Sequence, residues 1–340
     1  MKNNYIIVTG GGTGGHLSVA KTLIDEFYKR NYKIIFIGST NGADKAWFEN
    51  YKKIEKRFFF NTRGVVNQNL FGKLKSIFLI FKAFINSIQI IYKYKVKKIV
   101  SVGGFSAAPA SIAAIVSKKD FYIHEQNSIM GKLNKITAKY AKDIFSSYDK
   151  NATIKDYPIN QEFFKYARVR EKIKTIIFLG GSQGATAINN FALKVAPILK
   201  EKNINIIHQC GKYDYQRIKD SYKKMQIDVE LFDFSNNILK YMDKADFAIS
   251  RSGASTLWEL CAIGLPALYI PYPYAAANHQ FYNAKFLFDQ NLCFLKTQDQ
   301  LKSDTLDEIL NDDIKTKSSK LIKLIKKDGA KLIVDKILDD

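Results

Sequence analysis

The chain has 340 residues, of which 46% are hydrophobic and 25% are charged. This hydrophobicity excludes a disordered chain, and the length suits two domains, each with a core of its own. No secretory signal is expected, because the amino-terminal residues form neither a long apolar run nor a small-residue cleavage site. The three cysteines lie far apart without a CxxC pair, which favours reduced thiols in a cytosolic protein.

The formal net charge of +21 points to an anionic partner. Only 7 of the 53 basic residues are Arg, however, and proteins that read nucleic acids depend on Arg. We therefore expect no nucleic-acid partner and favour an anionic membrane surface, where each nearby Lys contributes about 1 kcal/mol.

Short apolar runs alternate with helical segments along most of the chain. They predict strands at residues 6–8, 33–38, 56–60, 98–103, 121–124 and 143–147, and again at 175–180, 204–209, 228–232, 246–250 and 267–270. Nearly all-apolar strands with intervening helices indicate parallel sheets covered on both faces, which is the doubly wound α/β class.

The first strand runs into a glycine-rich loop, GGGTGGH (10–16), that opens a helical segment. Glycine lets backbone N–H groups approach a ligand at the positive end of a helix, so the loop predicts a diphosphate site. A tight turn without a ligand is the alternative. The loop also fits GxGxxG, but the second strand ends Gly38-Ser39-Thr40 without the carboxylate of a nicotinamide-dinucleotide site, which disfavours a dehydrogenase.

Residues 69–98 contain seven Lys and no acidic residue, and their middle, 77–91, is apolar on almost every side. We expect this stretch to be too short and too often interrupted to span a bilayer, which needs about 20 apolar residues. It is either a core helix with a solvated basic end or a helix at the membrane interface, with its lysines toward anionic headgroups.

A polar, Pro-containing linker (147–172) precedes a second strand, glycine loop and helix, IIFLGGSQGA (176–185). Two such domains would leave a cleft at the carboxyl ends of their strands. GGSQG also fits the GxSxG elbow of serine hydrolases, with His208 and His279 following. A hydrolase leaves the first loop unexplained, so we favour Ser182 as a hydrogen-bond donor to phosphate.

All four histidines lie near predicted strand ends, and none has the spacing of a metal site such as HExxH. His16, at the mouth of the first loop, is the one we favour as a general base, since a neutral imidazole there can accept a proton from an attacking hydroxyl. The other histidines are more simply explained as hydrogen-bonded structural residues.

Two later stretches carry polar side chains into helices. In RSGASTLWE (251–259), Glu259 can accept from two vicinal ribose hydroxyls, or it can complete a capping box with Ser255 or Thr256. In the stretch that begins at Asn278, His279 and Gln280 can bind sugar hydroxyls, or Asn278 can simply cap the helix.

Together the motifs resemble one family closely, the MurG transferases of bacterial peptidoglycan synthesis. The motifs, in the order in which that family has them, are GGGTGGH (10–16), GGFSAAP (103–109), HEQN (124–127), GGSQGA (180–185), HQCGK (208–212), RSGASTLWE (251–259) and NHQFYNA (278–284). As a set they are highly specific, although no single one is.

The resemblance implies a GT-B fold, with two Rossmann-like doubly wound domains whose parallel sheets face a cleft. The domain at 1–150 would hold the lipid acceptor and contact the membrane, and the domain at 160–324 would bind UDP-GlcNAc. A last helix at about 325–340 would pack back on the first domain. The protein would then be peripheral, on the cytoplasmic side of the inner membrane.

The implied reaction is an inverting transfer of GlcNAc from UDP-GlcNAc to the C4 hydroxyl of MurNAc in lipid I, undecaprenyl-pyrophosphoryl-MurNAc-pentapeptide, which gives lipid II. His16 is the preferred base and Glu125 the second choice. Helix N-termini and loop amides would stabilise the leaving UDP, so neither a metal nor a cofactor is expected.

The family's donor contacts can be transferred to positions of this chain. Glu259 would fix the ribose, His279 and Gln280 would orient the GlcNAc, and Ser235 would lie at the uracil. The remaining contacts fall on Thr13, Gly14, Gly15, Asn127, Ser182, Ala254, Ser255 and Thr256.

Two departures from the family pattern stand out. Leu17-Ser18-Val19 replaces a Pro-containing helix start, and Asn160 stands where the family has an Arg that reaches the donor. Either Arg251, a lysine or the helix N-termini supply that charge, or donor binding is weaker. The alternatives are a UDP-GlcNAc 2-epimerase, which shares the architecture and the donor, or another GT-B glycolipid glycosyltransferase.

Overall fold

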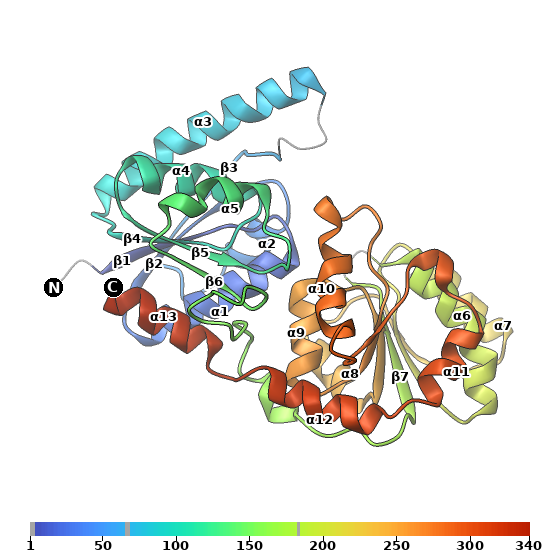
Figure 1. The fold of residues 1–340 in the computed structure, drawn as a ribbon. Coiled ribbons are helices and arrows are strands. Elements are labelled where there is room, and N and C mark those ends of the chain that lie inside the picture. Colours follow the sequence, from blue (N-terminus) through green and yellow to red (C-terminus); the bar gives the residue numbers. More distant parts are fainter. Residues whose placement is uncertain (1–3, 65–68, 182–183) are drawn as a thin grey trace. The chain divides into compact units, whose positions relative to one another are not determined.

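The computed structural model describes residues 4–64, 69–181 and 184–340 (Figure 1). The chain forms two compact units. Unit 1 comprises residues 1–160 and 327–340, and unit 2 comprises residues 161–326.

Unit 1 is built on a six-stranded parallel sheet of order β3-β2-β1-β4-β5-β6. Its strands are β1 (Tyr5–Thr9), β2 (Lys33–Ser39), β3 (Lys56–Phe60), β4 (Lys98–Ser101), β5 (Asp120–Glu125) and β6 (Asp143–Ser146). Its helices are α1 (Gly14–Lys29), α2 (Asp44–Phe48), α3 (Leu70–Lys93), α4 (Ala108–Val116), α5 (Lys132–Thr137) and α13 (Gly329–Asp339).

Alternating strand residues of unit 1 feed two cores. Ile7, Ile35 and Ile99 pack with Ile90 of α3 and Ala113 of α4, while the next residues along the strands point to the opposite face. The helix pair α1 and α13 lies on that opposite face, as Figure 1 shows. Both faces are therefore covered, as the near-continuous apolar strands predict.

Unit 2 repeats this plan with the order β12-β11-β10-β7-β8-β9, again all parallel. Its strands are β7 (Thr175–Leu179), β8 (Asn205–Gln209), β9 (Glu230–Phe232), β10 (Phe247–Ser250), β11 (Ala267–Tyr269) and β12 (Phe294–Leu295). Its helices are α6 (Thr186–Glu201), α7 (Tyr215–Lys224), α8 (Ile238–Lys244), α9 (Ala254–Ala262), α10 (His279–Phe288), α11 (Asp304–Leu310) and α12 (Ile314–Leu324).

All eleven predicted strands are present, and the doubly wound α/β class is confirmed in both units. The strand that the sequence does not reveal is β12, which has only two residues and too little length for a pattern. Strand order reverses between β1 and β4 in unit 1 and between β7 and β10 in unit 2. Ligands of doubly wound sheets bind at such switch points, beyond the carboxyl ends of the strands.

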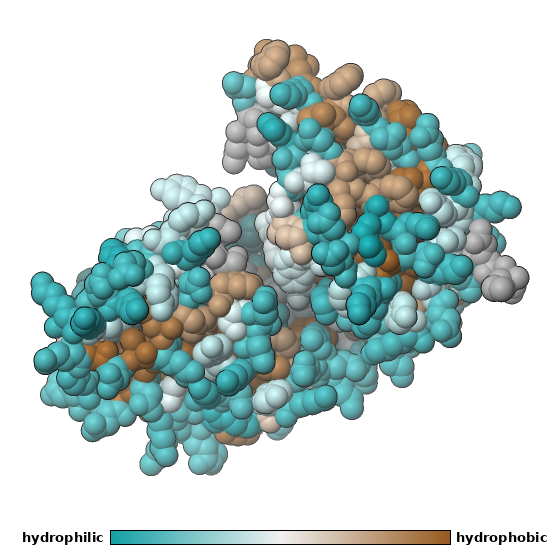
Figure 2. Space-filling view, turned by 180° about the vertical axis from the view of Figure 1, so that it is seen from behind, coloured by the Kyte–Doolittle hydropathy of each residue, from teal (hydrophilic) through white to brown (hydrophobic). Residues whose placement is uncertain are grey.

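The helix α3 corrects the expectation that residues 69–98 are too short to span a bilayer. It has 24 residues. Among the described helices it is the one that is long enough and apolar enough to cross a membrane, judged by length and composition alone. Its carboxyl-terminal part is nevertheless a core element, because Ile90 and Ile91 are buried with α4 and the sheet. The other part exposes a row of apolar side chains, visible as the brown surface over α3 at the top of Figure 2.

Candidate functional site

The loop after β1 in unit 1 interlocks with the loop after β4. The N–H of Gly11 donates to the carbonyl oxygen of Gly103 at 3.1 Å. A Cβ added at Gly104 would lie 2.1 Å from the carbonyl oxygen of Gly11, so no larger residue fits there. This contact places the first glycine loop at the switch point between β1 and β4.

His16 lies in the first turn of α1, beside this contact. Thr13 is the N-cap residue of α1, but its hydroxyl does not cap the helix and instead lies 3.0 Å from Nδ1 of His16. When Nδ1 carries the proton and donates to Thr13, Nε2 becomes the acceptor that a general base needs. A Cβ on Gly103 would meet the ring at 3.5 Å, so the imidazole lies against the β4 loop.

The prediction that the first loop presents its amides to a diphosphate is wrong for Gly11 and Gly12. Gly11 donates to Gly103, and Gly12 donates to the Oδ1 atom of Asp44 at 2.5 Å. The Asp44 carboxylate thus already accepts from the N–H of Gly12, and its negative charge disfavours an anion beside it. Thr13 and Gly14 are exposed at the start of the helix, and Gly15 is partly buried.

Glu125, at the end of β5, is buried and well supplied with hydrogen bonds. Its carboxylate accepts from the N–H of Asn127 at 2.9 Å, from the N–H of Gly131 at 2.9 Å and from Nδ2 of Asn134 at 2.8 Å. These donors hold the 127–134 loop to the sheet. The arrangement supports a positioning role for Glu125 and favours His16 over Glu125 as the base.

The glycine loop of unit 2 follows β7. The N–H of Gly180 donates to the carbonyl oxygen of Gln209 at 3.1 Å, and Gly184 has a φ of +79° that favours glycine. Ser182 lies outside the described residues. His208 is buried and bonded to Tyr222 and Asn189 at 3.0 Å each, and burial lowers its pKa to about 3. It is a structural histidine, which removes it as a partner for a hydrolase serine.

Arg251, directly after β10, makes hydrogen bonds to the loop that follows β11 and to Gln298. Its guanidinium donates to the carbonyl oxygens of Ile270 and Pro271 at 3.0 Å and to Oε1 of Gln298 at 2.8 Å. It also lies over the ring of Tyr272, 5.6 Å from the centroid. Both terminal nitrogens are thus engaged within unit 2, so Arg251 is poorly suited to replace the charge missing at Asn160, which is exposed.

The first turn of α9 holds Ala254, Ser255 and Thr256 at the switch point of unit 2. Its N-cap residue is Gly253, and no side chain caps the helix, so the capping-box alternative is wrong. Glu259 is partly buried one turn further on. Desolvation raises the pKa of its carboxyl to about 7, and within the described part of the chain no hydrogen bond or cation offsets that cost.

The loop before α10 presents His279 and Gln280. Asn278 has a left-handed φ of 53° and does not cap the helix with its side chain, so the simple capping alternative is wrong here too. Nδ1 of His279 donates to the carbonyl oxygen of Ala276 at 2.8 Å, which leaves Nε2 as an acceptor. Gln280 accepts from the N–H of Tyr272 at 2.9 Å, so its amide nitrogen remains a donor for a ligand.

Ser235 lies after the edge strand β9, and its hydroxyl accepts from the N–H of Asn237 at 3.0 Å. Apart from Ser182, the structure therefore places the predicted residues of each unit at the carboxyl edge of its own sheet, at strand ends, on the loops that follow or in the first two turns of the next helices. The residue that sequence reasoning missed is Asp44, because nothing in the stretch Asn41 to Asp44 indicates a contact with a loop 30 residues earlier.

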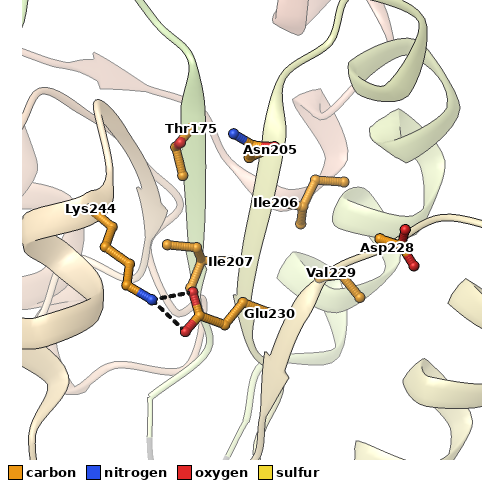
Figure 3. A pocket seen from close by; sticks show the side chains of 8 residues that line it. All are labelled: Thr175, Asn205, Ile206, Ile207, Asp228, Val229, Glu230 and Lys244. Carbon is orange, nitrogen blue, oxygen red and sulfur yellow. Dashed lines mark hydrogen bonds and ion pairs between the residues drawn. The ribbon is translucent and has the colours of Figure 1, made fainter.

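A pocket at the opposite edge of the unit 2 sheet is not a candidate for the same ligand (Figure 3). It is lined by the first residues of β7, β8 and β9, and the ion pair between Lys244 and Glu230, at 2.7 Å, closes one side. Ligands of doubly wound sheets bind at the carboxyl edge, where the motif residues lie.

Comparison with known proteins assigns both halves of the chain to domains of one family. Residues 6–146 match the glycosyltransferase family 28 N-terminal domain, and residues 175–337 match the glycosyltransferase family 28 C-terminal domain. A protein of Wolinella succinogenes is 48% identical over 98% of this chain and 99% of its own length. It is named UDP-N-acetylglucosamine–N-acetylmuramyl-(pentapeptide) pyrophosphoryl-undecaprenol N-acetylglucosamine transferase.

Solved structures confirm the GT-B architecture. The crystal structure of Acinetobacter baumannii MurG covers 99% of this chain and all of its own, with a TM-score of 0.81 at 23% identity. A UDP-GlcNAc 2-epimerase from Neisseria meningitidis, bound to UDP-GlcNAc, covers 99% and 100% with a TM-score of 0.67 at 12% identity. At such identities the likeness shows the fold alone.

Proposed function

The chain belongs to glycosyltransferase family 28, and on that premise we propose that it transfers GlcNAc from UDP-GlcNAc to the C4 hydroxyl of MurNAc in lipid I. The product is lipid II, and the anomeric centre inverts. The near-full-length likeness to curated transferases named for these substrates carries the proposal. The candidate residues at both switch points support it.

Unit 2 binds the donor in this proposal. The ribose hydroxyls donate to Glu259, Nε2 of His279 accepts from a GlcNAc hydroxyl, and the amide nitrogen of Gln280 donates to another. The amides at the start of α9 and the positive end of its dipole stabilise the charge that develops on the leaving UDP. The hydrogen bonds within unit 2 support these roles, because they leave Nε2 of His279 as an acceptor and the amide nitrogen of Gln280 as a donor.

Unit 1 binds the acceptor. Nε2 of His16 takes the proton of the C4 hydroxyl while that oxygen forms a bond to C1 of GlcNAc. The bond from C1 to the diphosphate oxygen breaks on the opposite side, and its electron pair leaves with UDP. The hydrogen bond between Thr13 and Nδ1 supports this role, because it holds the ring orientation and is compatible with the tautomer in which Nε2 is the acceptor.

The helix α3 holds unit 1 to the anionic inner leaflet, on the cytoplasmic side. The exposed apolar residues of its amino-terminal half are Leu70, Phe71, Leu74, Ile77, Phe78 and Phe81. Lys73, Lys75 and Lys82 are exposed among them. An apolar face interleaved with lysines is typical of a helix that lies in the headgroup region, and the buried Ile90 and Ile91 anchor its other end to the sheet.

The test is product analysis with the purified chain, radiolabelled UDP-GlcNAc and lipid I. Label that becomes lipid-extractable only when lipid I is present supports the transfer. Labelled UDP-ManNAc or free ManNAc formed without lipid I would instead identify a 2-epimerase. Label transferred to a different lipid would identify another glycolipid glycosyltransferase.

A further inference from the structure

Asp44 is a fully buried carboxylate that ties two loops of unit 1 together. Its Oδ1 atom accepts from the N–H of Gly12 at 2.5 Å, and its Oδ2 atom accepts from the N–H of Ser39 at 2.9 Å. Gly12 belongs to the loop after β1, and Ser39 is the last residue of β2. One side chain therefore fixes the ends of two adjacent strands.

The surroundings of Asp44 leave room for a carboxylate and little else. A Cβ at Gly11 would lie 2.6 Å from Oδ1, and one at Gly38 would lie 2.9 Å from Oδ2. Gly42, with a φ of +92°, packs so closely on Gly12 that its Cβ would lie 2.8 Å from the Gly12 carbonyl oxygen. Three glycines thus allow the loop after β2 to close on the loop after β1 around this group.

Gly12 immediately precedes the residue that orients His16. Thr13 has an extended backbone, with φ −131° and ψ 156°, and its hydroxyl lies 3.0 Å from Nδ1 of the imidazole. A shift of the Gly12 peptide therefore moves Thr13 and, through its hydroxyl, the ring. The contacts form a continuous series from Asp44 to Gly12, Thr13 and His16.

We propose that Asp44 is a positioning residue for the transfer reaction, which holds the Gly12 peptide so that Thr13 keeps the His16 imidazole in its catalytic orientation. The inference rests on the proposed function, with His16 as the base. Asp44 itself touches no substrate in this scheme.

A carboxylate suits this position better than its amide. Both oxygens of Asp44 accept from backbone N–H groups, and an asparagine offers one oxygen and one NH₂ group. In Asp44→Asn one of the two N–H groups would face another donor in a buried site, which costs free energy. Burial raises the pKa of Asp44, whereas the two N–H donors favour its ionised form.

The experiment compares Asp44→Asn with Asp25→Asn in the full-length chain. Asp25, on α1, pairs with Lys21 and Lys53 and has no contact with the glycine loop, so it is a matched control. Asp44→Asn is expected to lower kcat by about 10- to 100-fold, because small displacements of a catalytic group have effects of that size. Asp25→Asn leaves kcat and the KM for UDP-GlcNAc within about twofold.

A double-mutant cycle separates positioning from a general loss of folding. In a His16→Ala background, Asp44→Asn should cost less than about threefold in kcat, because the base that it positions is already absent. An equal loss in both backgrounds would overturn the proposal, and so would an unchanged kcat in His16→Ala alone.

A second variant covers the case in which Asp44→Asn does not fold. Thr13 is exposed, so Thr13→Val breaks the same series of contacts without disturbing the buried carboxylate. It should lower kcat by about 10-fold in the wild-type background and have little effect after His16→Ala. An unchanged kcat in Thr13→Val would contradict the claim that Asp44 positions His16 through Gly12 and Thr13. Failure of the proposed function is a separate result, in which the wild-type chain forms no lipid II.

Discussion

At the scale of single residues, the structure separates groups that are available for chemistry from groups that are already bound. Glu125 and Arg251 each make three hydrogen bonds to neighbours in their own units. Within the described residues, by contrast, no hydrogen bond or cation offsets the desolvation of Glu259, and His279 keeps Nε2 as an acceptor. His16 is oriented by its contact with Thr13. The catalytic predictions therefore concern these residues.

His16→Ala should lower kcat by about 10²- to 10⁴-fold, which is the usual contribution of a general base. The KM for UDP-GlcNAc should change little, because His16 is not among the predicted donor contacts. Steady-state kinetics with lipid I measures both parameters. A kcat equal to that of the wild type would remove His16 from the role of base.

Glu259 gives a pH dependence to donor binding. Its folded-state pKa is raised to about 7, so the carboxyl gains a proton as the pH falls below 7 and loses acceptor capacity for the ribose hydroxyls. The KM for UDP-GlcNAc should rise about 10-fold between pH 8 and pH 6, as one proton is taken up. In Glu259→Gln the KM should be high and independent of pH over this range. The same pH dependence in both proteins would show that another group titrates.

At the scale of elements, α3 shows how one helix combines two environments. Its buried end packs on α4 and the sheet, and its other end exposes apolar and basic residues together. Composition alone predicts both a core helix and an interfacial helix, and the structure assigns the core to the carboxyl-terminal end. The membrane interpretation of the exposed end stays a prediction.

Replacing Lys73, Lys75 and Lys82 by Gln should weaken binding to vesicles that contain anionic lipids by about 100-fold or more, since each Lys contributes about 1 kcal/mol. Activity on a soluble acceptor analogue should be unchanged. The matched control replaces Lys320, Lys323 and Lys327, which belong to α12 and the segment that follows it. Vesicle sedimentation measures both. Equal binding by the wild type and the α3 variant would exclude α3 as the contact.

The strands and the glycine loops could be predicted from the sequence because their signals are local. An apolar run identifies a buried strand, and clustered glycines identify a tight turn to a helix. The hydrogen bonds of Asp44, Glu125 and Arg251 could not be predicted in this way, since each joins segments separated along the chain. The first loop illustrates the difference: its position follows from the sequence, and the use of its Gly12 amide by Asp44 does not.

At the scale of the whole molecule, the chain ends by returning to the unit in which it begins. The helix α13 packs on α1, and Nε of Arg30 donates to Oδ1 of Asp335 at 3.0 Å. Nζ of Lys98 donates to the carbonyl oxygen of Ile337 at 2.7 Å, which satisfies one of the last carbonyls of α13. The last 14 residues therefore contribute to the stability of unit 1.

Ile337→Ala should destabilise unit 1 by about 2–4 kcal/mol, because Ile337 is fully buried in the contact between α13 and its unit. Calorimetry should show a lower Tm for one transition. The affinity for UDP-GlcNAc should be unchanged, because Ile337, in α13, is not among the predicted donor contacts. An unchanged Tm would mean that α13 contributes little to unit 1.

The division of donor and acceptor between the two units is tested most directly by amide hydrogen exchange in the full-length chain with each ligand alone. UDP-GlcNAc should slow exchange in the first turn of α9 and at the start of α10. A soluble lipid I analogue should slow exchange in unit 1 and leave those two segments unchanged. Protection by UDP-GlcNAc confined to the loop at 10–16 would contradict the assignment of the donor to unit 2.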